Sequence, residues 1–480
     1  MWRRGFAAFA LVGLVASTST SKDAGKVVED VARTIEATDL TSIRYSGSGY
    51  AYVFGQSYRP AGPYPKFYLK YSRVVDYQKG FSREESVRTQ FENPPRGGGN
   101  QPIYTEARGV VVVGENSPWG GSAVALTPQG WVKAAMASSP TAMSTILNGE
   151  PMIVVSFTMR EKYRVDGYIN NQNLLERVNT WMPNPILGDT LVETTYSDYR
   201  DFGGAKFPTK IVQKQGGFPV LELTVSDVQP NAAANIEVPK SPPPHVESQK
   251  IADGVWYLAG TPDPNSMAVE FKDYVVVIES SVTEERALAN IAEVKRLVPN
   301  KPIRYHLNSH HHSDHAAGLR AFVAEGSTII TQEMNKSFYQ QVVLKNSHGL
   351  QPDRLSEDPK PARFIWVKDK YVLTDGDRRL EIYWVPNAGH TADLLMSYLP
   401  KEKVLFITDI FNEFGEPRPN DPPPGIVTPY YAALGEKIKK LNLDVQRLAP
   451  SHGKGVVPLS ELTIHLQGKV QGPTIQPNSK

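Results

Sequence analysis

The chain has 480 residues, of which 40% are hydrophobic and 21% are charged, and its formal net charge is +2. Its length exceeds that of an ordinary single domain and predicts two domains. The small net charge, with no block of like charges, argues against a nucleic-acid partner or a polybasic membrane-binding segment. The sequence contains no cysteine. Disulfides, thiolate metal ligands and a cysteine nucleophile are therefore excluded, and any metal must be held by His, Asp or Glu.

The N-terminal segment is typical of a signal peptide. Arg3 and Arg4 precede an apolar run from Gly5 to Ala16, and a polar stretch rich in Ser and Thr follows. The run is too short to span a bilayer, and a lipoprotein anchor would need a cysteine to acylate. We predict that residues 1–22 are a signal peptide of the ordinary secretory or twin-arginine type. The mature chain is then expected in the periplasm or outside the cell, without stable membrane insertion.

Residues 23–229 have the pattern of an α+β domain that is built on an antiparallel sheet. Apolar residues recur at helical spacing from Lys26 to Thr38. Short β-branched and aromatic runs, broken by Gly, Pro and Asn, follow in residues 43–115 and 151–228. A helical insertion is predicted near Pro128 to Leu147.

Two segments of the chain are predicted to be irregular. The glycine run of Arg96 to Gly99 lacks the Gly-Lys-Ser/Thr continuation of a phosphate loop and is interpreted as a flexible loop. Residues 230–248 run through three alanines and three consecutive prolines, a composition that stiffens the backbone and cannot bury a core. This second segment is predicted to be a linker, with His245 exposed to solvent.

Residues 249–480 alternate short apolar strands with helices. Strands are predicted at Gly254–Ala259, Met267–Phe271, Tyr274–Ile278, Ile303–Leu307 and Thr328–Thr331, and helices at Glu284–Leu297 and Ala316–Glu325. A hairpin is expected around Asp375-Gly376-Asp377. The alternation predicts an α/β sandwich with its site in loops at the strand ends.

The most informative stretch is His310 to His315, which reads His-His-His-Ser-Asp-His. It holds four of the ten histidines and one carboxylate in the pattern H-x-H-x-D-H. Neutral imidazole and carboxylate are ligands that zinc and its neighbours prefer. The cluster is therefore a hypothesis for a metal site.

Three isolated residues farther along the chain are further candidate ligands. His390 follows a strand and a glycine turn, Asp409 follows the strand Val404–Ile407, and His452 lies between an apolar segment and Gly453. Each is expected at a strand end. The other histidines, namely His306, His311, His348 and His465, are interpreted as structural, with His311 pointing away from its neighbours' metal.

Taken together, these residues resemble the pattern of the metallo-β-lactamase-fold hydrolase superfamily. The resemblance covers residues 248 to 470 and implies an αβ/βα four-layer sandwich. It implies two metal ions per chain, one held by His310, His312 and His390, the other by Asp314, His315 and His452, with Asp409 bridging them. The implied ions are Zn²⁺, with iron or manganese as alternatives.

The implied activity is metal-dependent hydrolysis of a small molecule. A hydroxide bridging two metals would attack an electrophilic carbonyl, phosphorus or sulfur centre. Asp314, the candidate catalytic residue, or a metal-bound water would then protonate the leaving group. The sequence has no G-x-S-x-G motif for a serine hydrolase.

The bridging position narrows the expected substrate. The β-lactamases of this fold carry Cys or Ser there, so Asp409 favours an ester, lactone or thioester, with sulfatase, phosphodiesterase and β-lactamase activities as alternatives. Two departures from the family are Phe411-Asn412, where many lactonases have a Tyr, and Glu279, where members usually have Asp. The Pro-rich loop from Glu416 to Pro429 is expected to form a wall of the substrate pocket.

The sequence also leaves open a function of a different class. In element order, the N-terminal domain resembles the half-open sheets of periplasmic lipoprotein carriers, in which a helix lies against a curved antiparallel sheet. The alternative is a periplasmic lipid-binding carrier with an accessory metal domain.

Overall fold

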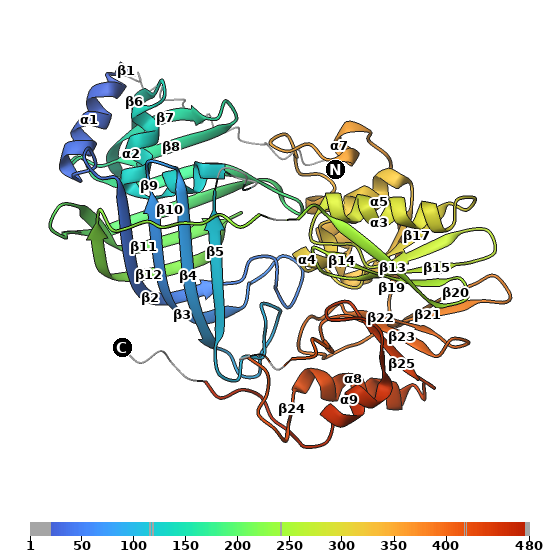
Figure 1. The fold of residues 1–480 in the computed structure, drawn as a ribbon. Coiled ribbons are helices and arrows are strands. Elements are labelled where there is room, and N and C mark those ends of the chain that lie inside the picture. The colour runs from blue at the N-terminus through green and yellow to red at the C-terminus, as the bar shows by residue number, and fades with distance from the viewer. Residues whose placement is uncertain are drawn as a thin grey trace, which may run out of the picture.

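The structure is a computed structural model that describes residues 21–114, 117, 120–240, 242–416, 418 and 420–475. The predicted signal peptide lies outside these residues except for Ser21 and Lys22, which form strand β1 (Ser21–Lys22) and pair with Met143 and Ala142. Figure 1 shows two halves side by side, a large curved sheet in the N-terminal half and two sheets with flanking helices in the C-terminal half.

The N-terminal half is built on one antiparallel sheet of 12 strands in the order β1-β6-β7-β8-β9-β10-β11-β12-β2-β3-β4-β5. The strands after β1 are β2 (Ser42–Tyr52), β3 (Lys66–Asp76), β4 (Phe81–Gln90), β5 (Ala107–Val113), β6 (Thr141–Leu147), β7 (Glu150–Met159), β8 (Tyr163–Ile169), β9 (Leu175–Asn184), β10 (Gly188–Asp201), β11 (Lys206–Gln215) and β12 (Phe218–Pro230). The α+β class predicted for this half is confirmed.

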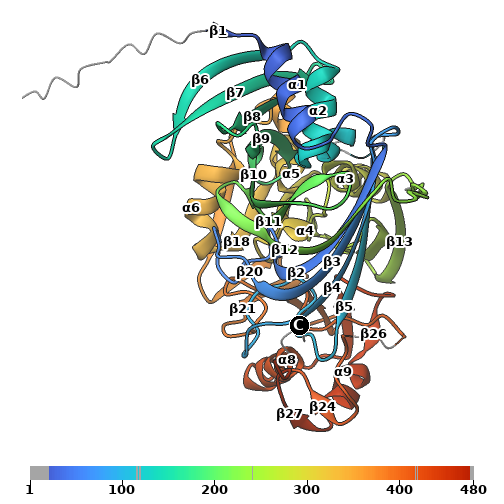
Figure 2. The same cartoon turned by 90° about the vertical axis from the view of Figure 1, so that its left-hand side faces the viewer.

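Two helices cover one end of this sheet and close its core. Helix α1 (Ala24–Thr34) begins where the Asp23 side chain accepts a hydrogen bond from the Lys26 backbone, and its apolar stripe is buried. Helix α2 (Pro128–Met136) follows a 3-10 turn (Gly120–Leu126) and buries Trp131. Figure 2 shows the two helices next to each other at that end.

The predicted helical insertion of Pro128 to Leu147 is only half correct. The helix ends at Met136, and Thr141–Leu147 is strand β6, which lies between β1 and β7. Thr141, Thr145 and Ile146 are β-branched and favour the extended backbone that pairing with β7 stabilises.

Among the described residues between β12 and β13, no helix or strand is formed. β13 begins at His245, inside the segment predicted as a linker of residues 230–248, and His245 is exposed.

The C-terminal half contains two packed sheets. The first has the order β13 (His245–Ala252), β14 (Val255–Thr261), β15 (Ser266–Glu270), β16 (Val275–Ile278), β17 (Ile303–Leu307), β18 (Thr328–Gln332) and β19 (Arg363–Val367). The second has the order β20 (Lys370–Thr374), β21 (Arg379–Trp384), β22 (Leu395–Leu399), β23 (Val404–Ile407), β25 (Arg447–Pro450) and β26 (Val457–Pro458). A small pair, β24 (Ile426–Val427) and β27 (Lys469–Val470), lies beside them.

Helices cover the outer face of each sheet. The helices of this half are α3 (Glu284–Leu297), α4 (Ser313–Ala316), α5 (Leu319–Glu325), α6 (Lys336–Phe338), α7 (Arg354–Glu357), α8 (Pro429–Lys440) and α9 (Leu459–His465). One apolar core lies between the two sheets, a second packs α3 and α5 on the first sheet, and a third packs α8 and α9 on the second. The predicted four-layer αβ/βα sandwich is thereby confirmed.

None of the helices that the structure describes combines the length and the apolar character that a membrane span needs.

Candidate metal centre

The seven predicted ligands lie beyond the carboxyl ends of strands from both sheets, five of them in loops and two, Asp314 and His315, in the short helix α4. His310 to His315 follows β17, His390 follows β21, Asp409 follows β23 and His452 follows β25. Strand β17 is the parallel neighbour of β16, and β23 is the parallel neighbour of β25. Because parallel strands end at the same edge of a sheet, their loops converge where the two sheets meet.

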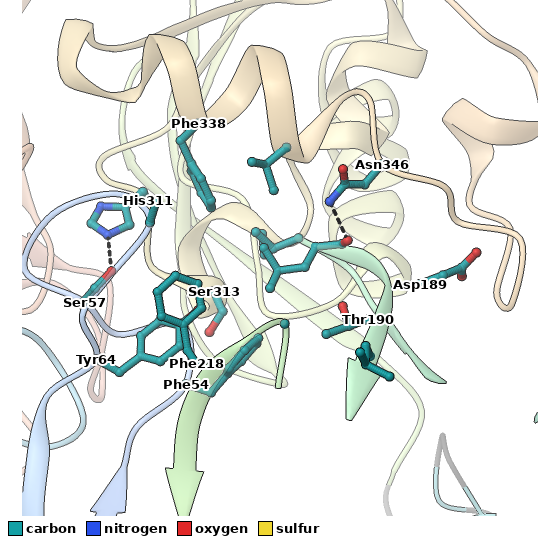
Figure 3. A pocket seen from close by; sticks show the side chains of 17 residues that line it. Phe54, Ser57, Tyr64, Asp189, Thr190, Phe218, His311, Ser313, Phe338 and Asn346 are labelled. Atoms are coloured by element: carbon teal, nitrogen blue, oxygen red, sulfur yellow. Dashed lines mark hydrogen bonds between the residues drawn. The ribbon is translucent and has the colours of Figure 1, made fainter. Parts of the chain in front are cut away.

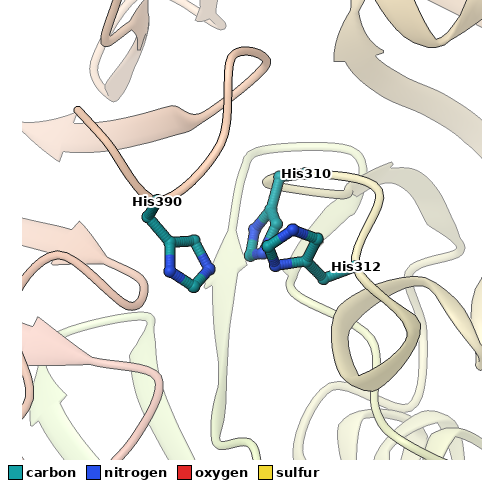
Figure 4. A group of neighbouring side chains, drawn as sticks. All are labelled: His310, His312 and His390. Carbon is teal, nitrogen blue, oxygen red and sulfur yellow. The ribbon is translucent and has the colours of Figure 1, made fainter. Parts of the chain in front are cut away.

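The first donor group consists of His310, His312 and His390. One ring nitrogen of each lies within 4.8 Å of the others, and all three residues are buried. Figure 4 shows that His310 and His312 come from one loop and that His390 faces them from another. The predicted juxtaposition of His390 with the histidine cluster is therefore present in the structure.

Hydrogen bonds fix which nitrogens of this first group are free. Ser309 Oγ donates to Glu279 at 2.5 Å, so at 2.8 Å it accepts from His310 Nδ1. His312 Nε2 donates to the Ser57 carbonyl oxygen at 2.8 Å. The lone pairs of His310 and His312 are therefore left on Nε2 and Nδ1, respectively.

The free nitrogens of the first group fit a metal ion. His310 Nε2, His312 Nδ1 and His390 Nε2 are all buried and have no hydrogen-bond partner in the described part of the chain. Buried polar atoms are rarely left without a partner. Three converging imidazole lone pairs are a donor set that Zn²⁺ and its neighbours prefer.

The electrostatics of this group also suit a cation. Burial lowers the pKa of His310 and His312 well below the ordinary value of a histidine, and neighbouring imidazoles lower it further. Burial likewise lowers the pKa of His390. All three rings are neutral at pH 7, which is the form that binds metal.

The second donor group consists of Asp314, His315, Asp409 and His452, whose ligand atoms also lie within 4.8 Å of one another. His315 Nε2 is 2.9 Å from Asp409 Oδ2 and 3.1 Å from His452 Nε2. The Nδ1 atoms of the two histidines face other carboxylates, those of Glu279 and Asp263. Both Nε2 atoms thus point into the group.

The carboxylates of the second group change its titration. Burial opposes a charge on His315, but Asp409, Asp314 and Glu279 raise its pKa well above the ordinary value. Burial likewise opposes a charge on His452, but Asp409 and Asp263 raise its pKa to about 10. A cation in this group has to compete with protons.

Asp409 lies between the two groups. Its Oδ2 is 3.6 Å from His310 Nε2, and its Oδ1 is 3.5 Å from His390 Nε2 and 3.4 Å from His452 Nε2. It has a φ of 52°, a left-handed conformation that is strained for a residue with a side chain. This position suits a carboxylate that contacts two cations.

Glu279, the predicted departure from the family, lies behind the two groups. It is fully buried, follows β16 with a φ of 73°, and contacts both Ser309 and His315 Nδ1. It also forms a third possible donor set with His310 and His315. Because its carboxylate oxygen is already engaged by Ser309 and His315, we interpret it as the residue that orients them.

A loop of the N-terminal half reaches the metal centre. Gln56 Nε2 donates to Asp314 Oδ1 at 2.7 Å, the Ser57 carbonyl accepts from His312, and the Ser313 backbone donates to the Gly55 carbonyl at 3.1 Å. In Figure 1 this loop, which follows β2, lies next to α4. Sequence reasoning missed these residues because no local pattern marks them.

The glycine run of Arg96 to Gly99 packs into the same region. An added Cβ at Gly98 would lie 1.8 Å from Gln56 Oε1 and 3.1 Å from His312 Cε1. The Gly97 backbone donates to the Gly389 carbonyl at 3.1 Å, just before His390. The run is an irregular loop, as predicted, but its small residues serve close packing beside the histidines.

A polar cavity of about 550 Å³ opens over the donor groups. Its lining includes Asp314, His390, Asp409 and His452 together with residues of the N-terminal half. Arg418, Asn420, Asp421, Pro422 and Thr428 also line it. The Pro-rich loop thus forms part of the wall, as predicted.

A second, apolar cavity of about 310 Å³ lies on the other side of the loop Phe54–Ser57. Figure 3 shows the rings of Phe54, Tyr64 and Phe218 on one side and Phe338 on another. His311 is also in its lining, where Nε2 contacts Ser57 Oγ at 3.1 Å and Nδ1 contacts Asp393 at 2.9 Å. His311 belongs to neither donor group among the described residues.

A comparison with protein families decides the identity of the C-terminal half. The model of the metallo-beta-lactamase superfamily matches residues 259–452. Residues 259–452 carry the fold of the metallo-beta-lactamase superfamily. The resemblance predicted from the histidine cluster is confirmed, and the domain has the fold of a metal-dependent hydrolase.

Relatives of this superfamily domain cover only part of the chain. An alkyl/aryl-sulfatase of Saccharomyces cerevisiae is 26% identical over 148 residues, which is 28% of this chain and 22% of that protein. A metallo-beta-lactamase type 2 of Elizabethkingia meningoseptica is 25% identical over 169 residues, which is 34% of this chain and 61% of that protein. The chain therefore spans less than two thirds of the length of either relative.

The C-terminal half is also similar to solved structures. A metallo-beta-lactamase from Pontibacter korlensis is 19% identical, covers 46% of this chain and 97% of its own, and superposes with a TM-score of 0.36.

Proposed function

We propose that the protein is an exported, dinuclear zinc-dependent hydrolase that cleaves an ester, lactone or thioester. The observation that carries the proposal is the pair of donor groups that meet at Asp409 under one polar cavity. When bound there, two zinc ions would polarise the substrate oxygen and make a water molecule more acidic.

The chain's own residues account for the rest of the chemistry. Gln56 holds one oxygen of Asp314 at 2.7 Å, while the other lies 3.6 Å from His315 Nε2. Asp314 lines the cavity and its side chain is 29% exposed. We assign Asp314 the transfer of a proton from the attacking water to the leaving group, with Gln56 fixing the orientation of the carboxylate.

Metal analysis and a substrate panel test this proposal. The purified protein is quantified for zinc, iron and manganese, and is assayed on an ester, a lactone, a thioester, a sulfate ester, a phosphodiester and a β-lactam. We expect chelator-sensitive hydrolysis of one or more of the first three. Protein with well below one metal per chain and no chelator-sensitive turnover would contradict it.

A sulfatase is the second candidate. It is supported by the similarity to the alkyl/aryl-sulfatase of Saccharomyces cerevisiae and by a cavity that combines the donor groups with two arginines. Faster turnover of an alkyl or aryl sulfate than of any carboxylic ester in the same panel would favour it.

Export rests on the sequence of the N-terminus alone. Arg3 and Arg4 before an apolar run predict cleavage near residue 22. Cell fractionation and N-terminal sequencing of the native protein test this. An uncleaved protein in the cytoplasmic fraction would contradict it.

A further inference from the structure

One arginine of the N-terminal sheet faces the metal cavity and pairs with no carboxylate among the described residues. Arg88 lies on β4 and lines the cavity together with Asp314, Asp409 and His452. Among the described residues, no side-chain hydrogen bond or ion pair holds its guanidinium. The guanidinium lies over the ring of Phe67, with its carbon Cζ 5.3 Å from the centre of that ring.

The acidic groups of the cavity are already engaged. Arg418 holds Asp421 with contacts of 3.1 and 3.2 Å, and stacks on Phe414. The other carboxylates serve the metal centre, since Asp263 pairs with His452, Asp314 accepts from Gln56, and Asp409 lies among the histidines. Among the described residues that line the cavity, Arg88 is therefore the arginine that no carboxylate neutralises.

The surroundings of Arg88 favour binding of an anion. Burial lowers the pKa of its guanidinium, and no nearby carboxylate raises it. A partly buried charge without a partner is unfavourable, and an anion in the cavity would relieve that penalty. Its place over Phe67, which is fully buried, restricts the side chain before any ligand arrives.

We propose that Arg88 is a subsite for an anionic group of the substrate, so that the enzyme prefers esters, lactones or thioesters that carry a second, negatively charged group. This inference rests on the proposed function because the scissile bond is placed at the donor groups. Guanidinium binds carboxylate through two parallel hydrogen bonds, so a carboxylate is the group we assign. The N-terminal sheet thereby selects the substrate for the superfamily domain.

Two matched pairs of substrates test the subsite. In the first, para-nitrophenyl hexanoate is compared with the para-nitrophenyl monoester of adipic acid, which has the same acyl length and a terminal carboxylate. In the second, para-acetoxybenzamide is compared with para-acetoxybenzoate, which places the charge on the leaving group. The zinc-loaded wild type is measured beside Arg88→Met, Arg88→Lys and the control Arg83→Met, which lies on the same strand and pairs with Glu85.

We expect Arg88→Met to raise KM for the charged member of at least one pair by about 10- to 100-fold, the range typical of a hydrogen-bonded charge. Its kcat and the kinetics of the neutral member should stay within about twofold, since loss of uniform binding raises KM alone and the neutral member offers Arg88 no anion. Arg88→Lys should retain part of the preference, and Arg83→Met all of it. Equal losses on charged and neutral substrates, or no loss on either pair, would overturn the proposal.

A binding measurement separates this inference from the proposed function. If no ester is hydrolysed by wild type, the proposed function fails, and adipate is titrated calorimetrically into the same zinc-loaded proteins. Binding that weakens about tenfold in Arg88→Met but not in Arg83→Met would support the anion subsite on its own. Equal affinity in wild type, Arg88→Met and Arg83→Met would overturn it.

Discussion

The two donor groups of the metal centre are built from different chemistry. The group of His310, His312 and His390 contains only imidazoles, whose pKa values burial lowers. In the other group, carboxylates raise the pKa values of His315 and His452 despite burial. The first group is therefore ready for a cation at neutral pH, whereas the second must first release protons. Neighbouring donor groups on one scaffold thus differ in their affinity for protons, because more carboxylates surround the histidines of the second group.

The largest expected effect comes from breaking the first group. His312→Ala removes the lone pair on Nδ1 and should abolish most metal binding at that group. Loss of a residue that merely orients a ligand lowers affinity or activity by about 10- to 100-fold, so loss of the ligand should lower activity by more. Metal content and ester hydrolysis are measured beside His245→Ala, an exposed histidine. Unchanged metal content in His312→Ala would show that the assignment is wrong.

The pH dependence of metal binding sharpens the contrast between the groups. Between about pH 8 and about pH 6 the first group stays neutral, whereas His315 and His452 carry protons that a second ion must displace. The affinity of the second ion should fall by about tenfold per pH unit for each proton displaced, and that of the first much less. Competition with a chelator at both pH values measures this. Equal pH slopes for the two ions would contradict the account.

A smaller effect tests the contribution of the N-terminal half. Gln56→Leu removes the hydrogen bond to Asp314 while keeping the size of the side chain. We expect kcat to fall by about 10- to 100-fold, the usual range for residues that orient a ligand. Gln78→Leu, on an exposed turn of the same half, is the control. Full activity of Gln56→Leu would mean that the loop merely packs there.

The smallest predicted effect is on stability, and it concerns a histidine outside both groups. His306 is fully buried, stacks on Phe322 at 3.9 Å, and has its pKa lowered by burial to about 3. In the unfolded chain the His306 side chain binds a proton with the ordinary pKa of about 6.5, whereas in the folded protein it does so only near pH 3. The folded state therefore loses stability as the pH falls from about 6.5 toward 3. Between pH 7 and pH 5, the free energy of unfolding of wild type should fall by about 2 kcal/mol more than that of His306→Leu. Urea unfolding of both proteins measures the difference, and parallel pH profiles would contradict it.

The sequence predicted the local parts of the molecule well. Helix α3 and strand β17 begin and end at the predicted residues, because helical periodicity marks the helix and the alternating apolar residues Ile303, Tyr305 and Leu307 mark the strand. The ligands of the histidine cluster share one loop, so their spacing alone reveals them. Helix α2 was extended too far because the segment after Met136 pairs with β7, which its own sequence does not disclose.

The distant parts of the site could not be predicted in this way. Gln56 and Asp314 are 258 positions apart, and Ser57 and His312 are 255 apart. A single glutamine or arginine in a strand or loop carries no periodic or spacing signal. The contribution of the N-terminal sheet to the cavity became visible only with the fold.

The most direct test of the central claim is a zinc titration of the metal-free protein, followed by calorimetry and by ester hydrolysis in the same samples. The account predicts two zinc ions per chain, with the second bound more weakly at low pH, and hydrolysis that rises with occupancy. It also predicts that His312→Ala and His452→Ala each lose one ion. Hydrolysis that persists without metal, or protein that binds less than one zinc ion per chain, would contradict it.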